Sequence, residues 1–436
     1  MIRYIVISLL IPLFFSCDNS ADIIDNIEED VPEITQNTGP NILLIIADDM
    51  GLDATPGYDI GTIKPNMPTL QGLMNSGIKF TNLWSNPTCS PTRASILTGK
   101  YGFKTNVLAP GDVLSTSETS LQNYIDTNTN TSYNHAVIGK WHLSNNAAHP
   151  NNMGINHFAG LLGGGVQSYW NWNLTENGTT TQSTTYTTTK FTDLAINWVA
   201  EQTTPWFLWL AYNAPHTPFH LPPNDLHAQG VLPSDQASID SNPLPYYMAA
   251  LEAMDSEMGR LINSMSEDEK ENTVIIFIGD NGTPNQVVQE HVSTRAKGSV
   301  YQGGVNVPMI IAGKNVARIN ETEDALINTT DLFTTIANIT GASTTEIHDS
   351  KSFKELLSST NNVEKRAYVY AENEDITIRN NTHKYIYFDD GSEALFNLGS
   401  NPLERPNLLN ANQLPLNASD SDIKDELTTE LAKIRN

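Results

Sequence analysis

Five short apolar segments, spread over the first two thirds of the chain, constrain its fold more than any other feature. They cover residues 41–46, 78–83, 136–138, 207–210 and 274–278. Most of them are apolar enough to be buried on both sides, as strands of a parallel sheet are. Helical patterns separate several of them, for example residues 246–265, where apolar residues recur at helix spacing. Strands that alternate with helices predict an α/β fold with a large, mixed, mostly parallel sheet flanked by helices.

Polar residues follow each of these segments. In chain order they are Asp48-Asp49, then Cys89 after a short connection, Lys140-Trp141-His142, His216, and Asp280-Asn281. Ligands of open α/β sheets bind outside the carboxyl ends of the strands. We therefore expect these side chains to converge at one edge of one sheet.

The pattern changes after about residue 343. Short strand-like segments at 366–370, 376–379, 384–388 and 394–397 precede a helical segment at 422–434. A chain of 436 residues exceeds what one core usually supports, so about two domains are expected. We predict a larger α/β domain at 40–345 and a smaller C-terminal α+β domain at 346–436, with an antiparallel sheet packed by a helix.

The N-terminus has the pattern of an export signal. Arg3 precedes an apolar run over residues 4–15 that is too short for a permanent membrane span. Ser16-Cys17 then resembles a bacterial lipobox, which predicts a signal peptide at 1–16 and a lipidated Cys17 that holds the protein on a membrane. The alternative is an ordinary secretory signal with an incidental cysteine. Residues 17–39 are acidic and predict a disordered tether. We thus expect an exported bacterial lipoprotein, at the outer membrane and cell surface or facing the periplasm.

Charge and cysteine content exclude some functions. The formal net charge is −25 and no basic run is present, so the chain is not expected to bind nucleic acid. The chain has two cysteines. Because the export signal accounts for Cys17, Cys89 has no obvious disulfide partner. It is either an inert buried thiol or a residue with chemistry of its own.

Cys89-Ser90-Pro91-Thr92-Arg93 is followed by Leu97-Thr98-Gly99. This Cys-x-Pro-x-Arg pattern resembles the maturation signature of formylglycine-dependent sulfatases, which are arylsulfatase-like members of the alkaline-phosphatase-like superfamily. Three further motifs of that family are matched by residues 139–143, 214–218 and 297–308, and its tail more loosely by residues 395–408. The chain departs from the family at Gln302, where glutamate is usual, and at Asn306, where arginine is frequent. The resemblance covers residues 40–310 well.

Asp48, Asp49, Asp280 and Asn281 offer hard oxygen ligands. Such a set favours Ca²⁺ or Mg²⁺ over zinc. The resemblance implies calcium, with the group formed from Cys89 as a further ligand. The oxygen donors by themselves also admit magnesium.

The resemblance implies that a maturation enzyme converts Cys89 to formylglycine, whose hydrate attacks the sulfur of a sulfate ester. Fixed cations would stabilise the charge on the sulfate oxygens, and the candidates are Arg93, Lys140, His142, His216 and Lys297. By the same resemblance Asp280 takes the proton of the attacking hydroxyl, His216 or Lys297 serves the leaving oxygen, and His142 takes the proton of the second hydroxyl.

The substrate class is less constrained. Export to a surface suggests a sulfated polysaccharide or oligosaccharide, and the aromatic cluster at 169–172 is either a sugar-stacking platform or packed core. Two other functions stay open. One is a phosphomonoesterase or phosphodiesterase of the same superfamily, and the other is a surface protein that binds sulfated glycans with an unconverted Cys89.

Overall fold

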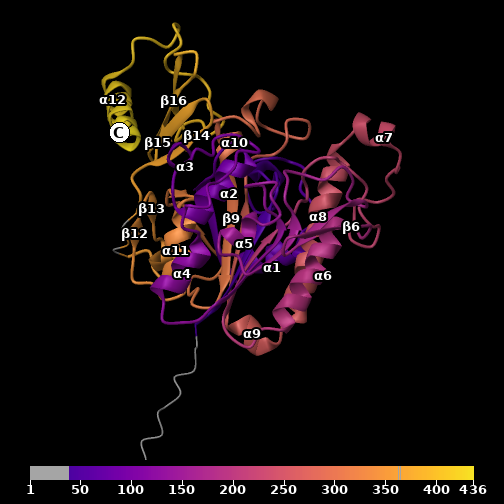
Figure 1. The fold of residues 1–436 in the computed structure, drawn as a ribbon. Helices are drawn as coiled ribbons and strands as arrows, with labels where there is room; N and C mark the ends of the chain where they lie inside the picture. Colours follow the sequence, from indigo (N-terminus) through magenta and orange to yellow (C-terminus); the bar gives the residue numbers. More distant parts are fainter. Residues whose placement is uncertain (1–38, 362, 364) are drawn as a thin grey trace, which may run out of the picture. The chain divides into compact units, whose positions relative to one another are not determined.

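A computed structural model describes residues 39–361, 363 and 365–436, which belong to one compact unit (Figure 1). The predicted signal peptide, Cys17 and the tether up to residue 38 lie outside the described residues. In the part of the chain that is described, no helix combines the length and apolarity needed to cross a membrane. The predicted boundary at 345/346 stays a prediction.

Among the described residues, eleven strands form one large sheet. Ten of them follow one another across it in the order β10 (Glu321–Glu323), β2 (Gly77–Trp84), β9 (Asn306–Gly313), β8 (Thr273–Gly279), β1 (Asn41–Ala47), β7 (Trp206–Ala211), β3 (Asn134–Lys140), β4 (His157–Leu161), β5 (Trp172–Glu176) and β6 (Thr179–Ser183), while β11 (Ile327–Asn328) pairs with β2. Strands β8, β1, β7, β3 and β4 are parallel, and β9 and the β5–β6 hairpin add the antiparallel pairs. The predicted mixed, mostly parallel sheet is confirmed, and its five predicted segments are β1, β2, β3, β7 and β8.

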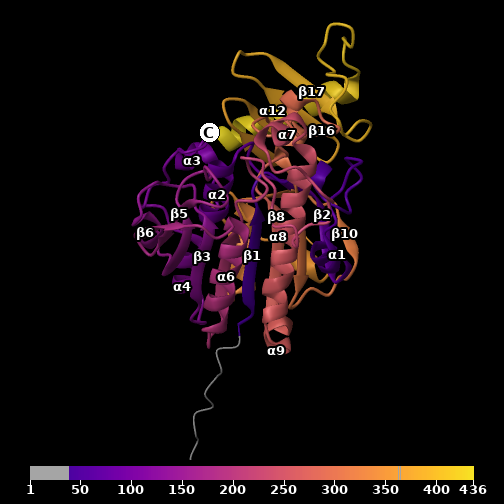
Figure 2. The same ribbon diagram turned by 90° about the vertical axis from the view of Figure 1, so that its right-hand side faces the viewer.

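Helices cover both faces of this sheet. Strand β1 shows why, because Ile42, Leu44 and Ile46 enter one core and Leu43 and Ile45 the other. The first core is closed by α2 (Cys89–Thr98), α4 (Leu121–Asn128) and α11 (Asp331–Ile339), and the second by α1 (Pro68–Asn75), α6 (Thr187–Ala200) and α8 (Leu244–Ser264). Figure 2 shows α6 and α8 side by side against the sheet, running roughly along its central strands. Burial on both faces explains why the central strands are continuously apolar.

Short elements fill the connections. They are the helices α3 (Gly102–Thr105), α5 (His149–Asn152), α7 (Gln236–Ser241), α9 (Glu267–Glu271) and α10 (Gln302–Val305), the 3-10 turns Leu52–Ala54, Ser293–Arg295 and Lys354–Leu357, and the strand pair β12 (Glu346–Ile347) and β13 (Ser350–Lys351). Most of the connections that follow the parallel strands carry polar residues of the site described below.

The C-terminal region forms a second, antiparallel sheet. Its strands are β14 (Val369–Glu372), β15 (Ile376–Arg379), β16 (His383–Tyr387) and β17 (Glu393–Asn397), and α12 (Ala418–Arg435) follows. Leu427 of α12 is fully buried against Ile378, Tyr385 and Leu395. The predicted small antiparallel sheet packed by a helix is confirmed.

A buried ion pair in the C-terminal region contacts α10, the short helix that leads into β9 of the large sheet. Lys384 in β16 lies 2.7 Å from the carboxylate of Glu404, and both side chains are fully buried. The same carboxylate accepts a hydrogen bond of 2.9 Å from the backbone N–H of Gln302 at the start of α10. Glu404 is part of the tail motif at 395–408, and Gln302 is part of the motif at 297–308. Through Glu404 the two motifs are therefore in direct contact.

Candidate active site

The predicted site residues meet at the carboxyl edge of the large sheet. Asp48 and Asp49 follow β1, Lys140 ends β3, His216 lies in the connection after β7, and Asp280 follows β8. Cys89 and Arg93 reach the same edge from the first turns of α2. The structure thus brings together the side chains that were expected to converge at the strand ends. The catalytic and metal-binding roles of the individual residues stay predictions.

Cys89 is the first residue of α2 and is only 2% exposed. Pro91 is tolerated in the first helical turn, and Gly99 ends the helix in the left-handed conformation with φ 68°. The thiol Sγ lies 3.4 Å from Asp48 Oδ1 and 3.3 Å from Lys140 Nζ. Burial raises the pKa of the Cys89 thiol far above its ordinary value, although Lys140 opposes the shift. The unmodified residue is therefore a neutral thiol and not the thiolate that nucleophilic cysteine chemistry requires.

Two ion pairs surround the thiol. Lys140 Nζ lies 2.5 Å from Asp48 Oδ2, and Arg93 Nη2 lies 2.8 Å from Asp280 Oδ2, with all four side chains fully buried. Burial by itself would raise the pKa of Asp280, but Arg93 and Lys140 outweigh it and lower this pKa to about 2. Burial also disfavours the charged form of Lys140, yet Asp48 and Cys89 raise its pKa. Each buried charge is thus compensated by a partner, as such charges must be.

Asp49 connects these pairs to a more open part of the site. One carboxylate oxygen lies 2.6 Å from Lys297 Nζ and 3.8 Å from His216 Nε2, and the other accepts a hydrogen bond of 2.7 Å from Asn281 Nδ2. The backbone of Asp49 is left-handed (φ 73°), and its N–H donates to Asp280 Oδ1 over 3.0 Å. Lys297 is 23% exposed, so it can meet a ligand from solvent.

The residues fit a hard divalent cation. Ligand atoms of Asp48, Asp49, Cys89 and His216 all lie within 4.8 Å of one another. Asn281 adds a carbonyl oxygen, Oδ1, which is buried and has no hydrogen-bond partner. A buried acceptor without a donor calls for an explanation, and coordination of a cation supplies one. Asp280 stands beside this group, although its two oxygens already accept hydrogen bonds from Asp49 and Arg93.

A glycine-rich loop closes on both histidines. A β-carbon at Gly164 would lie 2.5 Å from Cε1 and Nε2 of His142, and one at Gly165 would lie 3.3 Å from Cε1 of His216. At Gly164 glycine therefore permits an approach to His142 that a side chain would obstruct, whereas the contact at Gly165 is only tight. Burial, aided by Lys140 and Arg93, lowers the pKa of His142 to about 2. No sequence motif indicates this contact.

Two of the three aromatic residues at 169–172 are packed in the core, and only one is open to solvent. Tyr169 and Trp172 are 1% and 3% exposed, whereas Trp170 is 44% exposed. The hydroxyl oxygen of Tyr169 lies 2.8 and 2.7 Å from the backbone carbonyl oxygens of Asn213 and His216, which share its one hydrogen. Tyr169 therefore fixes the connection that carries His216, a role that the sequence did not reveal.

An α/β sheet that gathers a buried cysteine, oxygen ligands and fixed cations at one edge is the arrangement that the sequence motifs led us to expect of a sulfatase. The family model described as Sulfatase matches residues 40–342. The match covers well over half of the chain and includes every residue of the site. The chain belongs to the Sulfatase family.

Known proteins agree with this assignment. The chain is 26% identical over 356 residues to the uncharacterized sulfatase YdeN of Escherichia coli K12, covering 68% of this chain and 61% of that protein. It is 25% identical over 370 residues to arylsulfatase G of Rattus norvegicus, covering 71% of this chain and 66% of that protein. It thus spans less than two thirds of either relative.

Solved structures share the fold. Ps i-CgsB in complex with k-i-k-neocarrahexaose superimposes with a TM-score of 0.73 at 23% identity, covering 90% of this chain and 92% of that one. BT4656 in complex with its substrate D-glucosamine-2-N,6-O-disulfate gives a TM-score of 0.72 at 19% identity, covering 91% and 97%. At these identities the likeness shows the fold alone.

Proposed function

We propose that this chain is a sulfatase that hydrolyses sulfate esters at the site around Cys89. One observation carries the proposal: the cysteine of a Cys-x-Pro-x-Arg motif is buried with its Sγ 3.3 Å from a lysine and 3.4 Å from an aspartate. A neutral thiol is unsuited to attack, which supports conversion of Cys89 to formylglycine by a maturation enzyme. The oxygen ligands around it support a resident Ca²⁺, with Mg²⁺ as the other cation that they suit.

Formylglycine supplies a nucleophilic hydroxyl through its hydrate, and the cation neutralises charge on sulfate oxygens. Asp48, Asp49 and Asn281 would hold the cation, with Asp280 and residue 89 beside them. Arg93 and Lys140 are locked in place by the two buried ion pairs, so they present fixed positive charge without reorganisation.

The open side of the site suits an anionic ester. A hollow of about 300 Å³ is lined by Asp49, Thr88, Thr217, Asn285, Lys297 and their neighbours, and we call it the mouth. Asp49 raises the pKa of Lys297 against the effect of burial, so Lys297 enters the mouth as a cation. His142 is neutral, and a neutral imidazole has the lone pair needed to accept a proton. His216, 19% exposed beside Asp49, can reach a leaving oxygen.

A sulfated carbohydrate is the substrate class that we propose. Support comes from the solved neighbours, one in complex with k-i-k-neocarrahexaose and one with D-glucosamine-2-N,6-O-disulfate as its substrate. The lipidated Cys17, membrane attachment, and a place at the cell surface or facing the periplasm remain part of the proposal on the sequence alone.

Parallel assays test the function. The full chain, produced together with a formylglycine-generating enzyme, is given para-nitrophenyl sulfate, para-nitrophenyl phosphate and a panel of defined sulfated oligosaccharides. We expect release of sulfate and little phosphate. Preferential phosphate release would instead make the chain a phosphatase of the same superfamily.

Mass spectrometry of the peptide that contains residue 89 separates an enzyme from a binding protein. Conversion replaces the thiol sulfur by an aldehyde oxygen and lowers the peptide mass. A retained thiol in protein from the native host, together with absent sulfate release, would identify a glycan-binding protein.

A further inference from the structure

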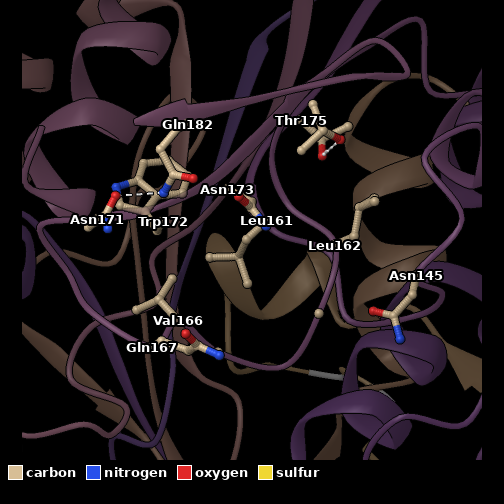
Figure 3. Close-up of a pocket in the computed structure, with 13 residues that line it drawn as sticks. Asn145, Leu161, Leu162, Val166, Gln167, Asn171, Trp172, Asn173, Thr175 and Gln182 are labelled. Carbon is tan, nitrogen blue, oxygen red and sulfur yellow. Dashed lines mark hydrogen bonds between the residues drawn. The ribbon is translucent and has the colours of Figure 1, made fainter. Parts of the chain in front are cut away.

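We propose that an open pocket beside the mouth binds an uncharged sugar unit adjacent to the sulfated one. The pocket lies between the end of β4, the loop at 162–167 and the β5–β6 hairpin (Figure 3). Its volume is about 630 Å³, within the range of small-molecule sites. The inference rests on the proposed function, because it assigns the neighbour of the sulfated residue.

The pocket and the mouth are separated by one contact. Gly163 and Gly165 line the pocket, and Thr217 lines the mouth. A β-carbon at Gly165 would lie 3.8 Å from the carbonyl oxygen of Thr217 and 3.3 Å from the ring of His216. The two hollows thus lie side by side at Gly165 and Thr217, so neighbouring units of one glycan can occupy them.

The lining is polar but uncharged. Five lining residues carry side-chain amides, namely Asn145, Gln167, Asn171, Asn173 and Gln182, and none of the thirteen is Asp, Glu, Lys, Arg or His. An amide donates and accepts hydrogen bonds, as a sugar hydroxyl does. A sulfate group placed here would lose water without gaining a cation, which is costly. The lining thus suits hydroxyl groups and disfavours a second sulfate.

Apolar residues complete the match to a sugar. Leu162 and Val166, which are only partly buried, also line the pocket, so they can pack against the C–H groups of a pyranose. Trp170, directly before Asn171, is 44% exposed and adds an aromatic surface next to the pocket. The mixture of amides and apolar groups matches an amphipathic ring better than an ion or a hydrocarbon.

The hairpin presents its amides in register. Asn173 pairs with Gln182 across the strands and Thr175 with Thr180, whereas Leu174 and Thr181 alternate with them. A two-residue turn sets this register, because Asn177 and Gly178 both have positive φ, 44° and 88°. In Figure 3 Asn171 and Gln182 lie on the side of the pocket away from Asn145.

Part of the amide capacity is unused. Gln182 Nε2 donates to Asn171 Oδ1 over 2.6 Å, and the hydroxyls of Thr175 and Thr180 lie 2.8 Å apart. The side-chain amides of Asn145, Gln167 and Asn173 make no hydrogen bond to the described part of the chain. These three groups are available to a ligand from two walls of the pocket.

Direct binding tests the inference without catalysis. The full chain is titrated with unsulfated tetrasaccharides of galactose, glucose, mannose and fucose, using calorimetry and saturation-transfer NMR. We expect at least one to bind, and the double variant Asn173→Ala/Gln182→Ala to bind it about tenfold more weakly. Gln167→Ala, on the other wall, is expected to weaken binding severalfold by loss of one hydrogen bond. Thr181→Ala, on the same strand but outside the lining, is the matched control and should bind as the parent does.

Sulfate release gives the second readout. Two oligosaccharides that differ only in a sulfate on the neighbouring sugar are compared with para-nitrophenyl sulfate. We expect the neutral-neighbour substrate to be preferred, and its kcat/KM relative to the aryl ester to fall about tenfold in the double variant, mainly through KM.

The inference is overturned if no neutral tetrasaccharide binds, if the double variant and Gln167→Ala bind as the parent does, or if the doubly sulfated substrate is preferred. A chain that binds neutral saccharides through these residues but releases no sulfate would instead overturn the proposed function and leave the pocket assignment standing.

Discussion

The ion-paired centre around Cys89 and the amide pocket beside it meet across one loop, yet they are built in opposite ways. The centre holds Asp48, Arg93, Lys140 and Asp280 with no exposed side-chain surface, whereas the pocket is open and its amides carry no charge. Low dielectric strengthens each interaction in the centre but also makes an unpaired charge costly. In the pocket each hydrogen bond contributes about 1 kcal/mol and can be lost singly. The molecule thus separates reaction from recognition, and substitutions in the two regions should differ in size.

The largest effect is expected at the cysteine. Cys89→Ser cannot regenerate an aldehyde, so each molecule should turn over at most once and multiple turnover should fall on the order of 10⁴-fold or more. The number of turnovers is measured as sulfate released per enzyme molecule, and mass spectrometry detects the sulfated protein that should accumulate. Sustained turnover by the variant would refute the aldehyde mechanism. Substitutions in the ion-paired centre would then not be expected to cost more activity than those in the amide pocket.

Removal of the cation should come next. Treatment with EDTA should abolish sulfate release, and Ca²⁺ should restore it. The protein should also melt at a lower temperature, since a ligand at about 100 times its Kd stabilises by about 2.7 kcal/mol. Melting scans with and without free Ca²⁺ give a readout that needs no substrate. Full activity in the presence of EDTA would show that the reaction does not need the cation.

Lys140→Met tests the buried pairs. It leaves Asp48 without its partner 2.5 Å away, so kcat should fall about 10²–10³-fold. The free energy of unfolding should fall by about 3–5 kcal/mol, as for other broken buried pairs. Kinetics and urea unfolding measure the two losses. Lys314→Met, at an exposed lysine, is the matched control. A kcat of the Lys140→Met variant within twofold of the parent would show that the buried charge of Lys140 does not contribute to catalysis.

The smallest effect at neutral pH is expected at His220, which packs against Tyr169 and Tyr186. Its ring stacks on Tyr169 with centroids 3.7 Å apart, Nε2 lies 2.9 Å from the Tyr186 hydroxyl, and burial lowers its pKa to about 4 from 6.5. The folded protein therefore binds this proton more weakly than the unfolded chain. Stability should be complete above about pH 6.5 and fall by about 3 kcal/mol as the pH drops to about 4.

The variant His220→Phe should flatten that acid dependence. Melting temperatures of parent and variant near pH 7 and pH 5 measure it, and the two curves should diverge as the pH falls. Parallel curves would show that the aromatic support of the pocket side is not acid-sensitive.

Most of the fold could be predicted because its strands are buried on both faces and therefore apolar throughout. Strand β9 is not among the predicted strands, although it is mostly apolar, and its Pro308 is a residue that central strands usually avoid. The pairing of β9 with β2 is irregular between Phe80 and Leu83, next to Pro308, and such irregularities are where sheets accommodate proline. Strand β6 lies in a Thr-rich stretch without apolar alternation, where the sequence allows an exposed loop or a hairpin, and the structure has the hairpin.

The position of the site could be predicted because strand ends converge, but its pairing could not. Arg93, Lys140 and Lys297 each find a different carboxylate, on Asp280, Asp48 and Asp49. Nothing in the spacing distinguishes these partners, because all the acids arrive at the same edge. The pocket amides gave no signal either, since they are scattered over residues 145–182 and only the fold gathers them.

The loop at 163–165 has a consequence for how such an enzyme can change its preference. At Gly164 a methyl group would lie 2.5 Å from the ring of His142, so this position accepts no side chain unless that imidazole moves. The hairpin opposite has no such constraint, and Asn173 and Gln182 can be exchanged without moving a reacting group. New glycan preferences in this lineage should therefore accumulate on the hairpin, while the glycine wall stays the same.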